Sequence, residues 1–293
     1  MLIVAGTPRS GTSMWMQILV AAGFEAIGEP FPGDWRALLS EANPDGFWES
    51  QLLGGVYYRT NPHPITGAFL FPEQTTFHAV KIMIPGLVRS DIAYLDRVIG
   101  TVREWRQFCA SRLRLRALYR NATGLEPQDD LFRNQLAPAL EWWVDNFALL
   151  RDVATRRYAA HVCSYQSLLD DPERAIDEVL RWLGRGDRER AIAAVRPQRQ
   201  TQRAEVPTPD LEPEFVQTFD DLYALIHEGR PLSAAFLAKL NETDRALRPR
   251  LLAHEAHARI AATRSLLDAE PAAPESGPEP TPDPRQPPRP AGN

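Results

Sequence analysis

The chain begins with an apolar run, a glycine-rich turn and a helical pattern in immediate succession. Residues 2 to 5 are apolar, residues 6 to 13 read GTPRSGTS, and apolar side chains then recur at helical spacing as far as Gly23. This order is typical of a loop that binds phosphate, because the strand and the helix aim the backbone N–H groups of the turn at one point. It predicts a three-layer α/β fold, P-loop-like, around a mostly parallel sheet of about five strands.

The turn keeps the glycine spacing of an ATP-binding loop but lacks its lysine. Thr12 stands at the lysine position, and the cation has moved inside the loop, to Arg9. Backbone N–H groups, the positive end of the helix dipole and donor side chains could together hold an oxyanion. A plain glycine turn without a ligand is the alternative interpretation. The residues expected to take part in an anion site are Arg9, Ser10, Gly11, Thr12 and Ser13.

Two further segments place polar residues where strands are expected to end. Residues 97 to 103 predict a short buried strand that ends in Arg103, and the helix expected over 104 to 112 carries Ser111 eight residues further on. Residues 162 to 172 predict a strand, a turn and the first residues of another helix. Taken alone, these residues favour a surface ion pair of Arg103 with Glu104 or Asp96 and a solvated helix position for Ser111.

These motifs resemble those of the PAPS-dependent sulfotransferases, in their bacterial, P-loop type. The loop is similar to the family signature T-x-P-[KR]-S-G-T-[TS], with one residue fewer after the first threonine. The spacing of Arg103 and Ser111 matches a second signature. The stretch at 164–172 resembles a third, although Gln166 and Ser167 replace its acidic pair. The stretch NPDGFWE at 43–49 resembles a pattern of bacterial members, and the whole resemblance covers about residues 1 to 205.

The resemblance implies a function and a role for each motif. It implies transfer of a sulfuryl group from PAPS (3′-phosphoadenosine-5′-phosphosulfate), without a metal, to a hydroxyl or amine of a small-molecule, carbohydrate or peptide acceptor. The loop would hold the 5′-phosphosulfate, with Arg9 stabilising the leaving oxygen. Arg103 and Ser111 would hold the 3′-phosphate, and Tyr165 would lie near the adenine. For Tyr165, core packing is the alternative.

A base for the acceptor proton is harder to assign. The segment KIMIP, beginning at Lys81, resembles the K-T-H-L-P of cytosolic sulfotransferases, but Met83 stands where the histidine is expected. Glu29 lies twenty residues after Arg9, an offset similar to that of the base in protein-tyrosine sulfotransferases. We expect Glu29 to be the base and Lys81 to assist Arg9, with Glu49 as the competing carboxylate. Ordinary solvated carboxylates are the alternative for Glu29 and Glu49, and a surface ion pair is the alternative for Lys81.

Composition excludes several other classes of protein. The net charge of −5 argues against nucleic-acid binding, and no apolar run reaches the ~18 residues of a membrane span. Two cysteines in expected core elements favour a cytoplasmic setting. His254 and His257 lack further ligands at metal-binding spacing, so no metal site is expected.

The chain divides into three parts by pattern. Residues 1–205 form the expected sulfotransferase domain, 206–270 a helical appendage, and 271–293 a disordered Pro-rich tail. The appendage could pack on the domain, cover the cofactor or pair two copies of the chain. Residues 54–78 predict an aromatic loop, either an acceptor lid or a packed insertion. A long helix is expected over 134–158, and two more over 212–228 and 232–268.

Two other functions are compatible with the loop. A P-loop kinase for a small molecule is one, although Thr12 and the lack of an evident Mg²⁺-binding aspartate motif count against it. A nucleotide-binding protein without turnover is the other, suggested by Met83 and Gln166.

Overall fold

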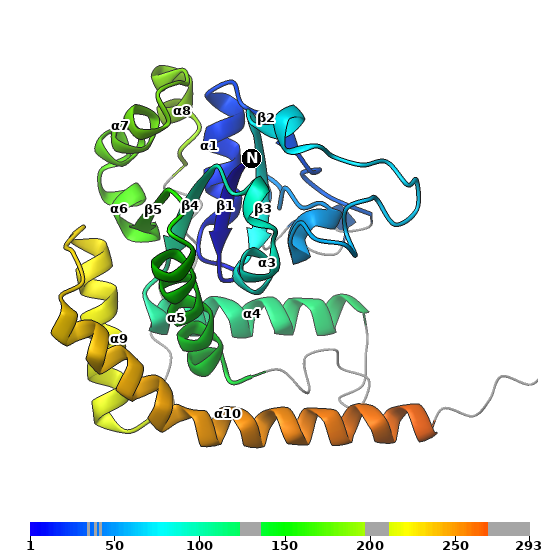
Figure 1. Cartoon of the computed structure of the whole chain (residues 1–293), viewed down its shortest axis with the longest axis vertical. Helices are drawn as coiled ribbons and strands as arrows, with labels where there is room; N and C mark the ends of the chain where they lie inside the picture. The colour runs from blue at the N-terminus through cyan, green and yellow to red at the C-terminus, as the bar shows by residue number, and fades with distance from the viewer. Residues whose placement is uncertain (34–35, 38–39, 41–42, 124–135, 197–210, 269–293) are drawn as a thin grey trace, which may run out of the picture.

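Five parallel strands form the centre of the computed structural model, which describes residues 1–33, 36–37, 40, 43–123, 136–196 and 211–268 (Figure 1). The strands lie in the order β2-β3-β1-β4-β5, and every neighbouring pair is parallel. This confirms the expected parallel sheet. The strands are β1 (Leu2–Gly6), β2 (Glu25–Ile27), β3 (His78–Met83), β4 (Arg97–Val102) and β5 (Ala160–Ser164).

Alternate residues of β1 face opposite sides of the sheet. Leu2 and Val4 join one buried apolar cluster, and Ile3 and Ala5 join another. Helices complete both clusters, so the sheet is the middle of three layers, as expected. The first cluster includes residues of α1 (Thr12–Ala21), α7 (Pro172–Leu183) and α8 (Arg188–Ala193), and the second includes residues of α3 (Ile84–Arg89) and α5 (Pro138–Arg156).

A third apolar cluster joins the C-terminal helices to the rest of the molecule. It lies between α4 (Trp105–Thr123), α5, α9 (Pro213–His227) and α10 (Ala234–Asp268). The ring of Phe219 on α9 stacks on Trp143 with centroids 5.0 Å apart and lies edge-on to Trp105 at 5.8 Å. Such aromatic contacts each contribute about 0.5–1.5 kcal/mol beyond the area that they bury. Figure 1 shows α9 and α10 beside α4 and α5, and α9 also contacts β5 at the edge of the sheet.

Several boundaries differ from the expected ones. Tyr165–Asp170 form a short helix, α6, where a turn was expected, because the Ser164 hydroxyl accepts the N–H of Ser167 (2.9 Å) and caps it. Helix α4 continues eleven residues beyond the expected end at 112, and α5 begins at Pro138 rather than at 134. Short 3₁₀ turns are η1 (Gln51–Gly54), η2 (Pro72–Thr75) and η3 (Ile92–Tyr94).

The C-terminal helices occur where they were expected, within two residues at their first ends. The expected tail at 271–293 and the expected domain boundary at 205 lie outside the described residues. None of the described helices is both long and apolar enough to span a bilayer.

Candidate functional site

A cavity of about 350 Å³ opens at the carboxyl ends of the strands. The residues that follow β1, β4 and β5, and the last residues of β3, all line it. This edge is where parallel α/β sheets bind ligands, and the volume lies in the range of small-molecule sites. The remaining walls come from the segment 43–49, Leu53, Arg196 and the second half of α4.

The loop after β1 has the geometry of an anion cradle. Gly11 caps α1 with φ of 100°, and its carbonyl accepts the N–H of Trp15 at 3.1 Å. The first N–H groups of α1 therefore have no partner within the helix and point out of its N-terminus, toward the cavity. No acidic residue stands in the first turn to neutralise this positive end.

Gly11 is required for two independent reasons. Its positive φ disfavours any residue with a Cβ, and a Cβ built there would lie 2.4 Å from Cδ2 of Tyr165. The ring of Tyr165 thus lies directly on the loop. Tyr165 is 8% exposed and lines the cavity, so it is both packed and accessible to a ligand.

Arg9 is fixed on two sides. Its backbone has φ of 74°, unusual for a residue other than glycine, and its carbonyl accepts Nη1 of Arg103 at 3.2 Å. Its own Nε donates to the Ser111 hydroxyl at 3.1 Å. Burial, followed by the charge of Arg103, lowers the pKa of Arg9 to about 10, which leaves it cationic at neutral pH.

Arg103 is buried without a carboxylate partner. Glu104 pairs with Arg106 and Asp96 pairs with Arg97, so the surface ion pair considered for Arg103 is absent from the described part of the chain. Its guanidinium lies 5.1 Å from the ring centroid of Tyr165, and its Nε is buried without a hydrogen-bond acceptor. A buried, unpaired cationic donor is costly unless a ligand satisfies it.

Ser111 and Ser10 hold the site together without lining the cavity. Ser111 is 3% exposed, so the solvated alternative is wrong, and its hydroxyl receives Arg9. The hydroxyl and the N–H of Ser10 both donate to the carbonyl of Thr7, at 2.8 and 3.2 Å. Ser10 therefore shapes the loop, and the structure does not place its side chain where a ligand would lie. Thr12 and Ser13 do line the cavity.

A buried ion pair lies beside the cradle. Nζ of Lys81 is 2.8 Å from Oε1 of Glu49 and 2.9 Å from the carbonyl of Phe47, and its side chain is 3% exposed. Ser13 donates to the same carbonyl at 3.1 Å. Burial lowers the pKa of Lys81, and the charge of Glu49 opposes that shift. Lys81, Glu49 and Ser13 thus form one cluster at the start of α1.

The segment 43–49 delivers Glu49 to this cluster. Trp48 has φ of 56°, a left-handed conformation that costs about 1–3 kcal/mol in a residue with a side chain. The resulting turn lets the Phe47 carbonyl and the Glu49 carboxylate both reach Lys81. The NPDGFWE motif singled out this segment in the sequence. Only the structure shows that it supplies the Phe47 carbonyl and the Glu49 carboxylate to the cluster.

Glu29 is not placed with the other expected site residues. It is exposed, and it lines a separate recess with Gly28 and Pro32 rather than the main cavity. Its backbone pairs with that of Glu49 through two hydrogen bonds of 3.0 Å. The two candidate carboxylates are therefore neighbours, but only Glu49 lines the cavity.

Part of the cavity wall was missed by sequence reasoning. Leu115 and Tyr119 of α4 line it, and they follow Ser111 at intervals of four residues, on one face of the helix. The helix was expected to end at 112, so this face was not anticipated. The aromatic loop at 54–78, by contrast, contributes no residue to the lining.

Two cations of the outer wall are already paired. Nε of Arg112 is 3.0 Å from both carboxylate oxygens of Glu141, and Nη1 of Arg196 is 3.1 Å from Asp45. In the described residues, no group of three or more His, Cys, Asp and Glu side chains could hold a metal ion.

No protein-family model and no curated protein matches this chain. Among solved structures, the chain is similar to one titled "Sulfotransferase Domain from the Curacin Biosynthetic Pathway". The two share 13% sequence identity with a TM-score of 0.39, over 85% of this chain and 97% of that one.

Proposed function

We propose that this protein transfers a sulfuryl group from PAPS to a hydroxyl or amine acceptor. The observation that carries the proposal is the pair of cationic positions, Arg9 and Arg103, that converge on one cavity beside an open helix N-terminus. A ligand with two separate anionic groups suits this arrangement. PAPS carries a 5′-phosphosulfate and a 3′-phosphate, which the sequence resemblance also implies.

Each part of the donor has a natural partner in this proposal. The N–H groups at the start of α1, with Thr12, Ser13 and Arg9, would hold the 5′ group. The unpaired Nε of Arg103 would donate to the 3′-phosphate. The ring of Tyr165, whose face already receives the Arg103 guanidinium, would stack against the adenine.

The reaction needs positioning and fixed charge more than covalent chemistry. The acceptor oxygen or nitrogen attacks sulfur, the bond from sulfur to the bridging oxygen breaks, and adenosine 3′,5′-bisphosphate leaves. Arg9 would stabilise the negative charge on that oxygen, with Lys81 nearby. The acceptor proton must pass to a base.

We propose Glu49 as that base, in place of Glu29. Lys81 holds Oε1 of Glu49, and Oε2 has no hydrogen-bond partner among the described residues. Because Glu49 lines the cavity, Oε2 is free to accept the proton of an acceptor hydroxyl there. Glu29 remains the alternative, since it pairs with Glu49 through the backbone.

The far wall of the cavity favours an acceptor with an apolar body. Its side chains are mostly apolar, and Arg112, Arg196 and Lys81 are each paired with a carboxylate of the protein. An anionic acceptor would find these cations already neutralised. The apolar residues are Met14, Phe47, Leu53, Met83 and Leu115.

A pair of nucleotides and one substitution test the proposal. Arg103→Ala is expected to weaken PAPS binding by about 1.5–3 kcal/mol, the usual worth of a hydrogen bond to a charged group. Adenosine 5′-phosphosulfate lacks the 3′-phosphate and should bind the variant and the parent equally in calorimetry. Equal losses for both ligands would show that Arg103 only supports the fold. Stabilisation of the parent by ATP but not by PAPS in thermal unfolding would instead favour a kinase.

A further inference from the structure

Three polar residues on one face of α9 reach the two strand ends that present Arg103 and Tyr165. Asp220, Tyr223 and His227 follow one another at intervals of three and four residues, so they share a side of the helix. Tyr223 also packs against the apolar cluster in which Phe219 of the same helix contacts α4 and α5.

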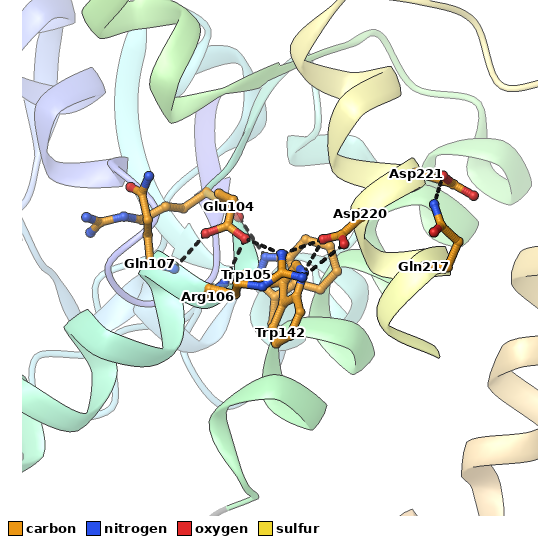
Figure 2. Close-up of polar contacts among 9 residues, drawn as sticks. Glu104, Trp105, Arg106, Gln107, Trp142, Gln217, Asp220 and Asp221 are labelled. Atoms are coloured by element: carbon orange, nitrogen blue, oxygen red, sulfur yellow. Dashed lines mark hydrogen bonds and ion pairs between the residues drawn. The ribbon is translucent and has the colours of Figure 1, made fainter. Parts of the chain in front are cut away.

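Asp220 contacts the residues just after the end of β4. Its Oδ1 accepts Nε1 of Trp105 at 2.7 Å, and its two oxygens accept the two terminal nitrogens of Arg106 at 2.6 and 3.0 Å. Figure 2 shows Asp220 facing Trp105 and Arg106, while Asp221 and Gln217 lie on the other side of α9. Burial raises the pKa of Asp220, but the bonds from Arg106 and Trp105 outweigh it and hold the pKa below its ordinary value.

These contacts fix the backbone from which Arg103 projects. Trp105 and Arg106 follow Arg103 by two and three residues. The carboxylate of Glu104, which lies between Arg103 and Trp105, accepts the N–H groups of Arg106 and Gln107 at 3.0 and 2.8 Å. On the other side, Nε1 of Trp142 donates to the Arg103 carbonyl at 2.8 Å. The main chain at Arg103 is thus held, while its side-chain Nε stays without a partner.

Tyr223 and His227 contact the end of β5 in the same way. Nδ1 of His227 is 2.9 Å from the Ser164 hydroxyl. Burial raises the pKa of Tyr223 to about 12, and the nearby Ser164 side chain opposes that shift. The rings of Tyr223 and His227 are stacked, with centroids 5.8 Å apart. Ser164 precedes Tyr165 and caps α6, which begins there. Helix α9 therefore holds the residue that orients Tyr165.

We propose that α9 is a positioning element of the donor site. In this proposal Asp220 fixes the orientation of Arg103 toward a 3′-phosphate, and Tyr223 and His227 fix the orientation of Tyr165 toward the adenine. This inference rests on the proposed function. It assigns to a helix beyond the expected domain a role in recognising a 3′-phosphorylated nucleotide. None of these three residues lines the cavity, so their effect must pass through Arg103 and Tyr165.

The energetics separate this role from simple packing. The Asp220 and Arg106 side chains are 38% and 36% exposed, and ion pairs at such positions contribute little to stability. The aromatic contacts of Phe219 already attach α9 to the domain. Losing the Asp220 carboxylate should therefore change ligand binding more than the free energy of unfolding.

The test compares Asp220→Asn with its neighbour. Asp221→Asn is the matched control, because Asp221 is on the same helix and pairs with Lys239 and Gln217 on the other side. Binding of adenosine 3′,5′-bisphosphate and of adenosine 5′-phosphate is measured by calorimetry, and Tm is recorded for each variant. Asp220→Asn should weaken the bisphosphate about 5- to 10-fold and leave the monophosphate unchanged, and Asp221→Asn should change neither.

A second variant tests the contact of α9 with the end of β5. Tyr223→Phe removes one hydroxyl with no change of shape, and it should weaken both nucleotides by a similar factor, since both carry adenine. This arm also applies if Asp220→Asn does not fold.

The outcomes separate this inference from the proposed function. A lower Tm for Asp220→Asn with an unchanged ratio of the two affinities would show a merely structural role and overturn the inference alone, as would full binding by Tyr223→Phe. A parent protein that binds both nucleotides equally would overturn the proposed function and this inference with it.

Discussion

At the scale of single residues, the loop arginine differs most from the lysine of an ATP-binding loop. Arg9 lies within the turn, in a left-handed conformation, and Ser111 on a separate helix fixes its Nε. A guanidinium held in this way has a fixed plane, which in the proposed function would suit the oxygens of a transferring sulfuryl group. A lysine could supply charge there but not the same geometry.

We therefore expect Arg9→Ala to lower kcat by about 10²–10³, the scale for removing one donor that acts in the transition state. Arg9→Lys should keep part of the rate because it keeps the charge. Steady-state kinetics with PAPS measures both. An unchanged kcat with only a raised KM for PAPS would mean that Arg9 binds the ground state and the transition state equally, against the proposal.

Substitutions of Glu49 and Glu29 are expected to have opposite effects on kcat. Glu49→Gln keeps the size and the contact with Lys81 but removes the basic oxygen, so kcat should fall by about 10²–10⁴ while PAPS still binds. Glu29→Gln serves as the matched control, being the exposed neighbour on the same backbone bridge, and should keep most of the activity. The reverse pattern would restore Glu29 as the base.

At the scale of elements, one face of α4 connects the two halves of the site. Ser111 contacts Arg9, and Leu115 and Tyr119 continue that face by one and two turns, about 6 and 12 Å further along the helix. Leu113 lies on another face and is 46% exposed. In the proposed function, the same helix would orient the donor through one turn and offer an apolar surface to the acceptor through the next.

Leu115→Gln tests this division. It should lower kcat/KM about tenfold for an acceptor with an apolar body, such as 2-naphthol, because a polar group then faces the apolar part of the substrate. PAPS affinity should not change. Leu113→Gln, on the solvent side of the same helix, should match the parent in both measurements. An unchanged kcat/KM for Leu115→Gln would place the acceptor elsewhere in the cavity.

At the scale of the whole molecule, charge is distributed unevenly. The chain carries a net charge of −5, yet its main cavity is lined by Arg9, Lys81 and Arg103. Behind this wall, Arg112 and Arg116 both pair with Glu141, one turn from Asp145. Burial, followed by the charge of Glu141, raises the pKa of Asp145 to about 7, although Arg112 opposes the shift.

The raised pKa predicts how stability depends on pH. Between the ordinary carboxyl pKa of about 4 and the folded value of about 7, the native protein binds more protons than the unfolded chain, so this group's contribution to stability falls as pH rises through that window. Asp145→Asn keeps the shape and removes the titration. The Tm of the variant minus that of the parent should therefore be larger at pH 8 than at pH 5. An equal difference at both values would contradict the buried titration.

The sequence by itself determined what depends on local chemistry. Strand, glycine turn and helix at residues 2 to 23 specify the loop, because backbone geometry and the helix dipole are set by neighbouring residues. The parallel sheet followed from its alternating strands and helices. Arg103 and Ser111 could be singled out by their spacing, although only their burial removed the competing interpretations.

Only the tertiary structure decided which of these groups meet. Glu29 and Glu49 are equivalent as sequence features, and it was the turn at Trp48 and the contact with Lys81 that placed Glu49 in the cavity and left Glu29 outside it. The hydroxyl of Ser10 donates to the carbonyl of Thr7 within the loop rather than pointing into the cavity. Asp220 reaches Trp105, 115 residues away, because the aromatic cluster folds α9 back onto α4. Such contacts depend on how long segments pack, and no local pattern contains that information.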